Sequence, residues 1–186
     1  MVSIDLTYLM GELEKQELEA PNGVASPQAY EQLLAIYLYK NDLCNAKYLW
    51  KRIPSQIKES NPELGHIWSV GQYMWKKDYP SIYNALNSVT WTETVADIMK
   101  KVQESVRDRA IQLISQAYSS ITLEAVCAMT GLPPDSCCKT CIDRQWQIES
   151  DSKIVHPVLS DAQSIGQTSS EDQLYKLTDF VSFLEN

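Results

Sequence analysis

The residues from Thr92 to Ser119 carry the pattern that most constrains this chain. No Gly or Pro interrupts them, and apolar side chains recur at steps of mostly three and four: Val95, Ile98, Met99, Val102, Val106, Ala110, Leu113, Ile114 and Ala117. This spacing predicts one amphipathic helix, and Thr90 with Glu93 has the spacing of a capping box at its start. A helix of about 27 residues is roughly 40 Å long, more than a small domain needs. We therefore expect it to bridge two bodies, one before it and one after it.

The chain before this stretch predicts further helices joined by short breaks. Ile4–Glu19 has apolar residues at helical spacing, and Pro21-Asn22-Gly23 ends it. Ser26 followed by Pro27 is typical of a helix start, here of a helix through Tyr39. Asn41 and Asp42 turn the chain into a third helix, Leu43–Ile53, which Pro54 ends. Residues 1–121 are therefore expected to form a mainly α unit.

Residues 30–53 and 66–89 match weakly at an offset of 36 positions. Tyr37 then falls on Tyr73, Lys40 on Lys76 and Asp42 on Asp78. Each copy predicts two helices and a turn, and a period of this length is typical of stacked, tetratricopeptide-like repeats. Two unrelated helical hairpins with similar turns are the alternative. In either case we expect aromatic residues to fill the seams between helices: Tyr37, Tyr48, Trp50, Trp68, Tyr73, Trp75 and Tyr83.

Residues 122–158 predict a second, smaller module. Thr122–Thr130 and Pro134–Trp146 read as short helices separated by a Gly-Leu-Pro turn, and Gln147–Glu149 and Ile154–His156 read as a hairpin that Pro157 ends. Helix, turn, helix and two-stranded wing is the order of a winged helix. Winged helices often bind DNA through the second helix, but that helix here balances Lys139 and Arg144 with Asp135 and Asp143. We therefore expect this module to bind protein.

The last residues predict a linker, 159–169, and an amphipathic helix, 170–186. The helix carries a wide apolar stripe: Leu174, Leu177, Phe180, Val181 and Leu184. A helix this short is marginal alone in water, so the stripe must dock on something. It docks either on this chain's own helical layer or on a neighbouring protein, and the Ser/Gly/Gln-rich linker favours the neighbour.

Charge and composition exclude several classes of function. The chain has 16 basic and 24 acidic residues, a net charge of −8, without the clustered Lys and Arg that a phosphate backbone requires. It has no apolar run of membrane length and no signal-peptide pattern. Five cysteines without such a signal indicate free thiols in a reducing compartment. We expect a protein of the cytoplasm and nucleus that binds neither nucleic acid nor membrane.

The residues that catalysis or a metal needs are scarce and scattered. The only histidines, His66 and His156, are far apart in sequence, and no phosphate-binding or dinucleotide-binding glycine motif occurs. Cys138 and Cys141 have the spacing of half a zinc site, but no second pair exists to complete it. Positions 138, 141 and 142 also share one helical face, where free Cys packs as a small apolar residue. We expect no catalytic residue, metal or cofactor.

Helical repeats that run through a long helix into a winged helix, with a terminal helix behind, resemble a PCI domain. This is the shared domain of the proteasome lid, the COP9 signalosome and translation initiation factor three. Within that family, several segments are similar to the small PCI subunit of the signalosome: 16–21, 46–54, 67–72, 115–118 and 177–186. The resemblance covers nearly the whole chain.

The resemblance implies a non-catalytic scaffold subunit in a hetero-oligomer. The signalosome removes Nedd8 from cullins, which regulates cullin-RING ubiquitin ligases, and a different subunit, a zinc metalloprotease, performs that chemistry. PCI subunits join their winged helices edge to edge, so Ile148, Ile154 and Val155 on the two strands are expected to bind a neighbouring PCI subunit by strand addition. Such subunits also pool their terminal helices in a bundle. The equivalent small subunit of the proteasome lid or of the initiation factor is the alternative, and a nucleic-acid-binding winged-helix protein is a third that the charge disfavours.

Overall fold

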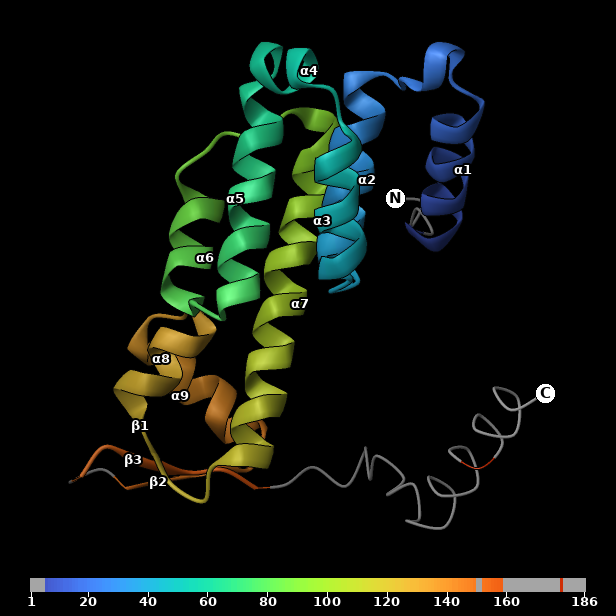
Figure 1. The fold of residues 1–186 in the computed structure, drawn as a ribbon. Coiled ribbons are helices and arrows are strands. Elements are labelled where there is room, and N and C mark those ends of the chain that lie inside the picture. Colours follow the sequence, from blue (N-terminus) through green and yellow to red (C-terminus); the bar gives the residue numbers. More distant parts are fainter. Residues whose placement is uncertain (1–5, 150–151, 159–177, 179–186) are drawn as a thin grey trace.

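The computed structural model describes residues 6–149, 152–158 and 178, and these residues are mainly helical (Figure 1). The predicted helices before the long helix are present, with one short addition at Ser55–Ser60. The elements in order are α1 (Leu6–Glu19), the 3₁₀ turn η1 (Pro21–Gly23), α2 (Pro27–Tyr39), α3 (Leu43–Arg52), α4 (Ser55–Ser60), α5 (Pro62–Lys76), α6 (Tyr79–Asn87), α7 (Glu93–Ala117), β1 (Ile121–Thr122), α8 (Leu123–Thr130), α9 (Pro134–Asp143), β2 (Gln147–Glu149) and β3 (Ile154–His156).

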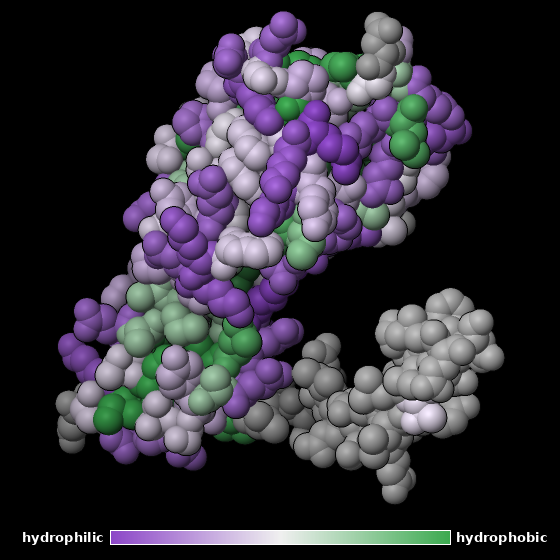
Figure 2. Space-filling model, viewed as in Figure 1, coloured by the Kyte–Doolittle hydropathy of each residue, from purple (hydrophilic) through white to green (hydrophobic). Residues whose placement is uncertain are grey.

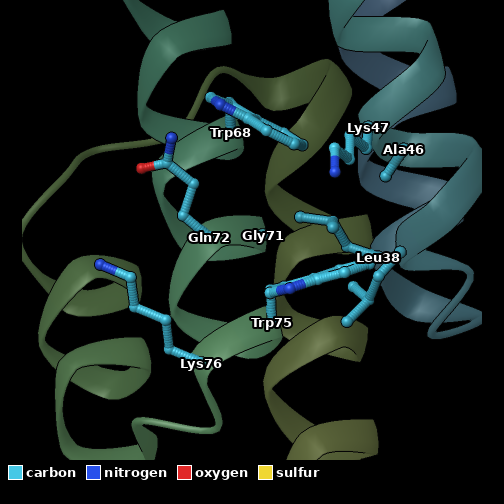
Figure 3. Close-up of a pocket in the computed structure, with 9 residues that line it drawn as sticks. Leu38, Ala46, Lys47, Trp68, Gly71, Gln72, Trp75 and Lys76 are labelled. Atoms are coloured by element: carbon cyan, nitrogen blue, oxygen red, sulfur yellow. The ribbon is translucent and has the colours of Figure 1, made fainter.

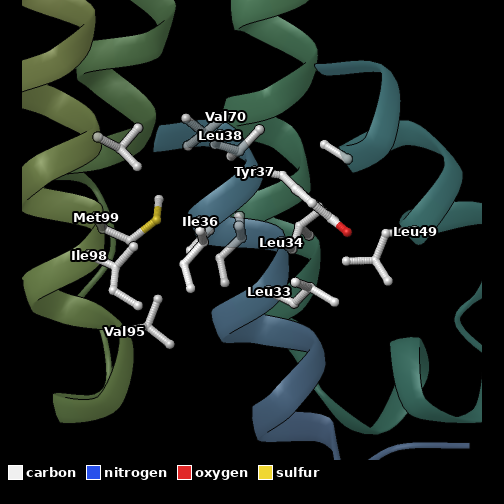
Figure 4. Close-up of a cluster of buried hydrophobic side chains, with 14 of the residues drawn as sticks. Leu33, Leu34, Ile36, Tyr37, Leu38, Leu49, Val70, Val95, Ile98 and Met99 are labelled. Carbon is white, nitrogen blue, oxygen red and sulfur yellow. The ribbon is translucent and has the colours of Figure 1, made fainter. Parts of the chain in front are cut away.

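Helix α2 is the centre of the first layer, with α1, α3, α5 and α7 packed around it (Figure 1). From Leu33 to Leu38 every side chain is buried, so this helix is apolar on all sides rather than on one stripe. Figure 4 shows its side chains meeting Val95, Ile98 and Met99 of α7. Apolar burial of this extent is the main stabilising contribution to the layer.

The two helical hairpins repeat each other at the level of single hydrogen bonds. In the first turn Asn41 has a positive φ, and the Asp42 amide donates to the Tyr37 carbonyl at 2.9 Å. In the second turn Lys77 has a positive φ, and the Asp78 amide donates to the Tyr73 carbonyl at 3.1 Å. Both Asp side chains then cap the next helix. The weak match at the offset of 36 therefore marks two hairpins with the same turn.

The long helix is confirmed, but its predicted capping box is wrong. The helix begins at Glu93 with Thr92 as its N-cap, so Thr90 lies outside it. The Thr92 side chain makes no capping bond, and the Thr92 amide instead donates to the Glu63 carboxylate of α5 at 2.8 Å. A residue distant in sequence therefore supplies a partner for the helix start.

The apolar stripe of α7 serves two separate cores. Its first part, through Val106, belongs to the core of the helical layer, whereas Ile111 and Ile114 belong to a second cluster. Ile111, absent from the predicted stripe, is buried, and Leu113 and Ala117, predicted to face inward, are exposed. The second core lies against a different side of the helix, so one straight stripe could not predict both contacts.

The second module consists of α8, α9 and a three-stranded antiparallel sheet in the order β1-β3-β2. The two predicted helices and both strands are present, and β1 is an additional strand. Its core is small: Ile111, Ile114, Ile121, Val126, Cys137, Cys141, Trp146 and Val155. Cys137 and Cys141 face this core while Ile142 is exposed, which corrects the predicted face of 138, 141 and 142.

The aromatic prediction is correct for five of its seven residues. Trp50 and Trp68 stack between α3 and α5 with ring centroids 5.4 Å apart, and Tyr37, Tyr73 and Tyr83 lie buried or half-buried. Tyr48 and Trp75, however, are 57% and 53% exposed. These two large aromatic side chains therefore lie on the surface of the helical layer instead of in its core.

Candidate functional site

The sheet of the second module contains the residues that the sequence assigned to partner binding. β3 is the central strand, with Val155 paired to Ile121 of β1 on one side and to Ile148 of β2 on the other. Val155 is fully buried, and Ile154 lies on the same central strand. Ile154 and Val155 therefore do not lie at a free edge, because β1, which the sequence did not predict, pairs with the far side of β3. That these residues bind a partner stays a prediction.

The hydrogen-bond register shows where the free edge lies. The Leu123 amide donates to the Lys153 carbonyl at 2.9 Å, which makes these residues a hydrogen-bonded pair between β1 and β3. Bonded and non-bonded pairs alternate in an antiparallel ladder, so Val155 points its backbone groups toward β1. Its neighbours on β3 consequently point theirs toward β2, where they meet Gln147 and Glu149.

It follows that Ile148 directs its N–H and C=O away from β3. In the part of the chain that the structure describes, no strand pairs with that outer side of β2. The Ile148 side chain is half-buried and packs on the small core of the module. One backbone donor and one acceptor are thus held in place by a packed side chain and remain available to another strand.

Polar contacts fix the hairpin beside this edge. The Ser152 hydroxyl donates to the Glu149 carboxylate at 2.6 Å, and His156 Nε2 lies 3.4 Å from it. The Ser152 hydrogen bond, followed by His156, lowers the pKa of Glu149 below its ordinary value. The edge therefore ends in a carboxylate that stays ionised at neutral pH. The other ring nitrogen of His156, Nδ1, lies 3.3 Å from the Ser119 carbonyl.

The surface around the sheet is more apolar than the rest of the face in view. Figure 2 shows hydrophobic side chains gathered over α8 and α9, whereas the helical layer above them is mostly hydrophilic. Ile142 of α9 is 65% exposed. The sequence analysis predicted positions 138, 141 and 142 on the inward face of this helix, so it did not expect Ile142 at the surface. The buried positions are instead Cys137 and Cys141. The buried side of α9 is the side that packs on Trp146 and Val155.

The cysteines and histidines do not form a reactive centre in the described residues. Burial raises the pKa of Cys137 and of Cys141, which keeps both thiols neutral. His66 is exposed on α5, far in sequence from His156. Within residues 6–149, 152–158 and 178, no three His, Cys, Asp or Glu side chains lie close enough to hold a metal ion. None of the helices in those ranges is both long and apolar enough to span a bilayer.

The predicted C-terminal contacts, Leu174, Leu177, Phe180, Val181 and Leu184, lie outside the described residues. Their role as a docking stripe stays a prediction.

Comparison with known proteins shows to which family the chain belongs. The model of the CSN8/PSMD8/EIF3K family matches residues 24–164. COP9 signalosome complex subunit 8 of Xenopus laevis is 47% identical over 184 residues, which is 99% of this chain and 94% of that protein. The protein of the same name from Danio rerio is 43% identical over 100% of this chain and 97% of that protein. The one from Arabidopsis thaliana is 31% identical over 81% of this chain and 76% of that protein. The chain belongs to the CSN8/PSMD8/EIF3K family.

Proposed function

We propose that this protein is a subunit of the COP9 signalosome, with the part that subunit 8 has in that complex. The observation that carries the proposal is the 47% identity across 99% of the chain to a protein of that name. Identity of this extent includes both the helical layer and the second module. The complex in which we place it removes Nedd8 from cullins, and the role of this subunit is assembly with other PCI subunits.

A non-catalytic role is the version of this function that the described residues support. A thiol nucleophile needs a lowered pKa, whereas burial raises the pKa of Cys137 and Cys141. The polar side chains near the sheet, Glu149, Ser152 and His156, bond to one another and to backbone on the surface. They position the hairpin rather than enclose a substrate.

The experiment is affinity purification of the tagged full chain from cells, followed by native mass spectrometry of the intact complex. We expect the other signalosome subunits in equal stoichiometry. Recovery of the proteasome lid or of translation initiation factor three in their place would overturn the assignment and favour the alternative within the family.

For the contact itself, we propose that the outer edge of β2 receives a strand from a neighbouring PCI subunit. The N–H and C=O of Ile148 face away from β3 and meet no other strand in the described part of the chain, and the exposed Ile142 extends the contact onto α9. Ile148→Pro removes that amide donor without removing a bond between β2 and β3. The control is Ile148→Ala, which also removes the packed Ile side chain, and more of it than Pro does, but retains the N–H.

We expect Ile148→Pro to lower incorporation into the complex well below that of Ile148→Ala, while far-ultraviolet circular dichroism of the two free proteins stays alike. Equal incorporation of the two variants would exclude this backbone donor as a contact. Val155→Pro is unsuitable for this purpose, because the Val155 amide points to β1 inside the sheet.

A further inference from the structure

A groove between α3 and α5 lies on the helical layer, away from the sheet of the second module. Trp68 and Trp75 extend from α5 toward α3, which contributes Ala46 and Lys47 (Figure 3). Leu38 of α2 and Gly71 of α5 form its floor, where a Cβ on Gly71 would lie only 3.0 Å from the Leu38 side chain. The cavity has a volume of about 260 Å³.

The walls of the groove are apolar and held in place. Trp68 is fixed by its stack on Trp50, with the two rings 8° from parallel. The Lys58 ammonium lies 4.8 Å from the Trp50 ring centroid and covers the outer side of that pair. Trp75 is 53% exposed, with the Lys47 ammonium 5.2 Å from its ring centroid. A rigid wall loses little conformational entropy when a ligand binds.

The charge around the groove is opposite to that of the chain as a whole. The protein has a net charge of −8, yet α3 has three basic residues and no acidic one. On α5 the only acidic residue is Glu63, which bonds to the Thr92 amide at the far end of that helix. The carboxylates of Asp42 and Asp78, next to the two helices, accept hydrogen bonds from Asn45 and Ser81.

Lys47 and Lys76 line the groove, and Lys51 lies one helical turn after Lys47 on α3. Among the described residues, no carboxylate lies within ion-pair distance of Lys47, Lys51 or Lys76, whereas Arg52 pairs with Glu17 of α1 at 2.9 Å. Ammonium groups next to exposed aromatic rings attract carboxylates and apolar side chains together.

The size of the cavity favours a single side chain over a larger ligand. Pockets for drug-sized molecules and cofactors enclose about 300–1,000 Å³, so this groove is small for them and suits one large side chain. We infer that the groove binds an acidic peptide segment of another protein, which inserts one aromatic or long aliphatic side chain between Trp68 and Trp75 while its carboxylates pair with Lys47 and Lys51. This surface is separate from the edge of β2, and the inference does not depend on the proposed function.

The test is selection of a phage-displayed library of random 12-residue peptides on the immobilised full chain, and then synthesis of the enriched peptides. We expect enrichment of Asp and Glu around one large apolar residue. Fluorescence polarisation with the labelled peptides should show at least about a tenfold loss of affinity for Trp75→Ala, as is usual for an aromatic anchor. Lys47→Glu should weaken binding by several-fold, and so should raising the salt from 0.05 to 0.5 M.

Matched variants distinguish the groove from general stickiness. Tyr8→Ala removes an aromatic side chain on α1 that is even more exposed than Trp75, and Lys100→Glu reverses an exposed charge on α7. Both should retain full affinity. Peptides without acidic enrichment, or affinities that Trp75→Ala leaves unchanged, would overturn the inference. So would self-association of the free chain that Trp75→Ala abolishes, because the occupant would then be a second copy.

Discussion

Gly131 ends α8 with a φ of +64°, and the ring of Tyr83 from α6 lies directly over it. A Cβ at this position would lie 2.5 Å from the Tyr83 ring, closer than any real contact allows. Burial raises the pKa of Tyr83 to about 12, so its hydroxyl stays protonated and donates to the Met129 carbonyl at 3.2 Å. This single residue therefore sets how closely the second module approaches the helical layer.

We expect Gly131→Ala to destabilise the protein by about 2–5 kcal/mol, the sum of left-handed strain of about 1–2 kcal/mol and overpacking of about 1–3 kcal/mol. Gly23→Ala is the control, because Gly23 has a φ of +70° but nothing within 4 Å of the added Cβ. It should lose only the strain. Urea unfolding of both variants measures the difference, and equal losses would show that the contact with Tyr83 is unimportant.

Glu31 is another residue whose environment is unusual, since it is only 4% exposed and accepts a hydrogen bond from Asn61. Burial raises the pKa of Glu31 above the usual 4.5, the Asn61 bond opposes that rise, and the Glu63 charge adds to it. The folded state therefore holds the proton more tightly than the unfolded state. Stability contributed by this group declines as the pH rises from 4.5 through the raised pKa.

Glu31→Gln should consequently gain stability relative to the original chain at pH 7.5, and this gain should shrink as the pH falls toward 4.5. Paired urea titrations at the two pH values measure the difference, in which the titration of all other groups cancels. A gain that is the same at both pH values would contradict the assignment of this shift to Glu31.

At the scale of elements, α7 starts where α5 supplies a carboxylate. Glu63 accepts a hydrogen bond from the Thr92 amide, and an acid near a helix N-terminus also interacts favourably with the helix dipole. We expect Glu63→Ala to destabilise the protein by roughly 1 kcal/mol, the usual effect of losing an N-terminal cap. Thermal unfolding measures it. Thr90→Ala, at the position that the capping-box spacing predicted, should change stability by less than about 0.5 kcal/mol. A larger loss for Thr90→Ala than for Glu63→Ala would support the capping box instead.

At the scale of the whole molecule, one helix joins two cores. Val95 to Val106 pack on the helical layer, and Ile111 and Ile114 pack under the sheet. Between them Arg107 donates to the Thr130 carbonyl at 3.0 Å and lies over the Tyr83 ring at 6.0 Å, so α6, α7 and α8 meet at one point. Both cores, as far as the structure describes them, are made of residues between 6 and 155.

Deletion of residues 170–186 should therefore leave a cooperative thermal unfolding transition close to that of the full chain. The same truncation should lose stable incorporation into the purified complex, because the predicted apolar stripe of Leu174, Leu177, Phe180, Val181 and Leu184 would be missing. A large fall in melting temperature with incorporation retained would place that stripe in this chain's own core.

Local patterns in the sequence determined the helices other than α4, the repeated turns and both strands of the hairpin. Periodicity, Asp caps and Pro or Gly breaks act within a few residues, so they can be read without knowing the fold. The resemblance to PCI proteins likewise needed only the order of these elements and short matching segments. The charge balance already disfavoured nucleic acid as a partner.

Tertiary structure alone decided which surfaces remained free. The segment Ile121–Thr122 is too short to show a strand pattern, yet it pairs with β3 and buries Val155. Among the described residues this leaves Ile148 with its backbone groups facing away from the sheet. Glu63 replaces Thr90 at the start of α7, and Trp75 stays exposed beside Lys47, because helices distant in sequence meet there. The physical reason is the same in each case: burial and hydrogen bonding between elements depend on how the whole chain packs, which no local pattern contains.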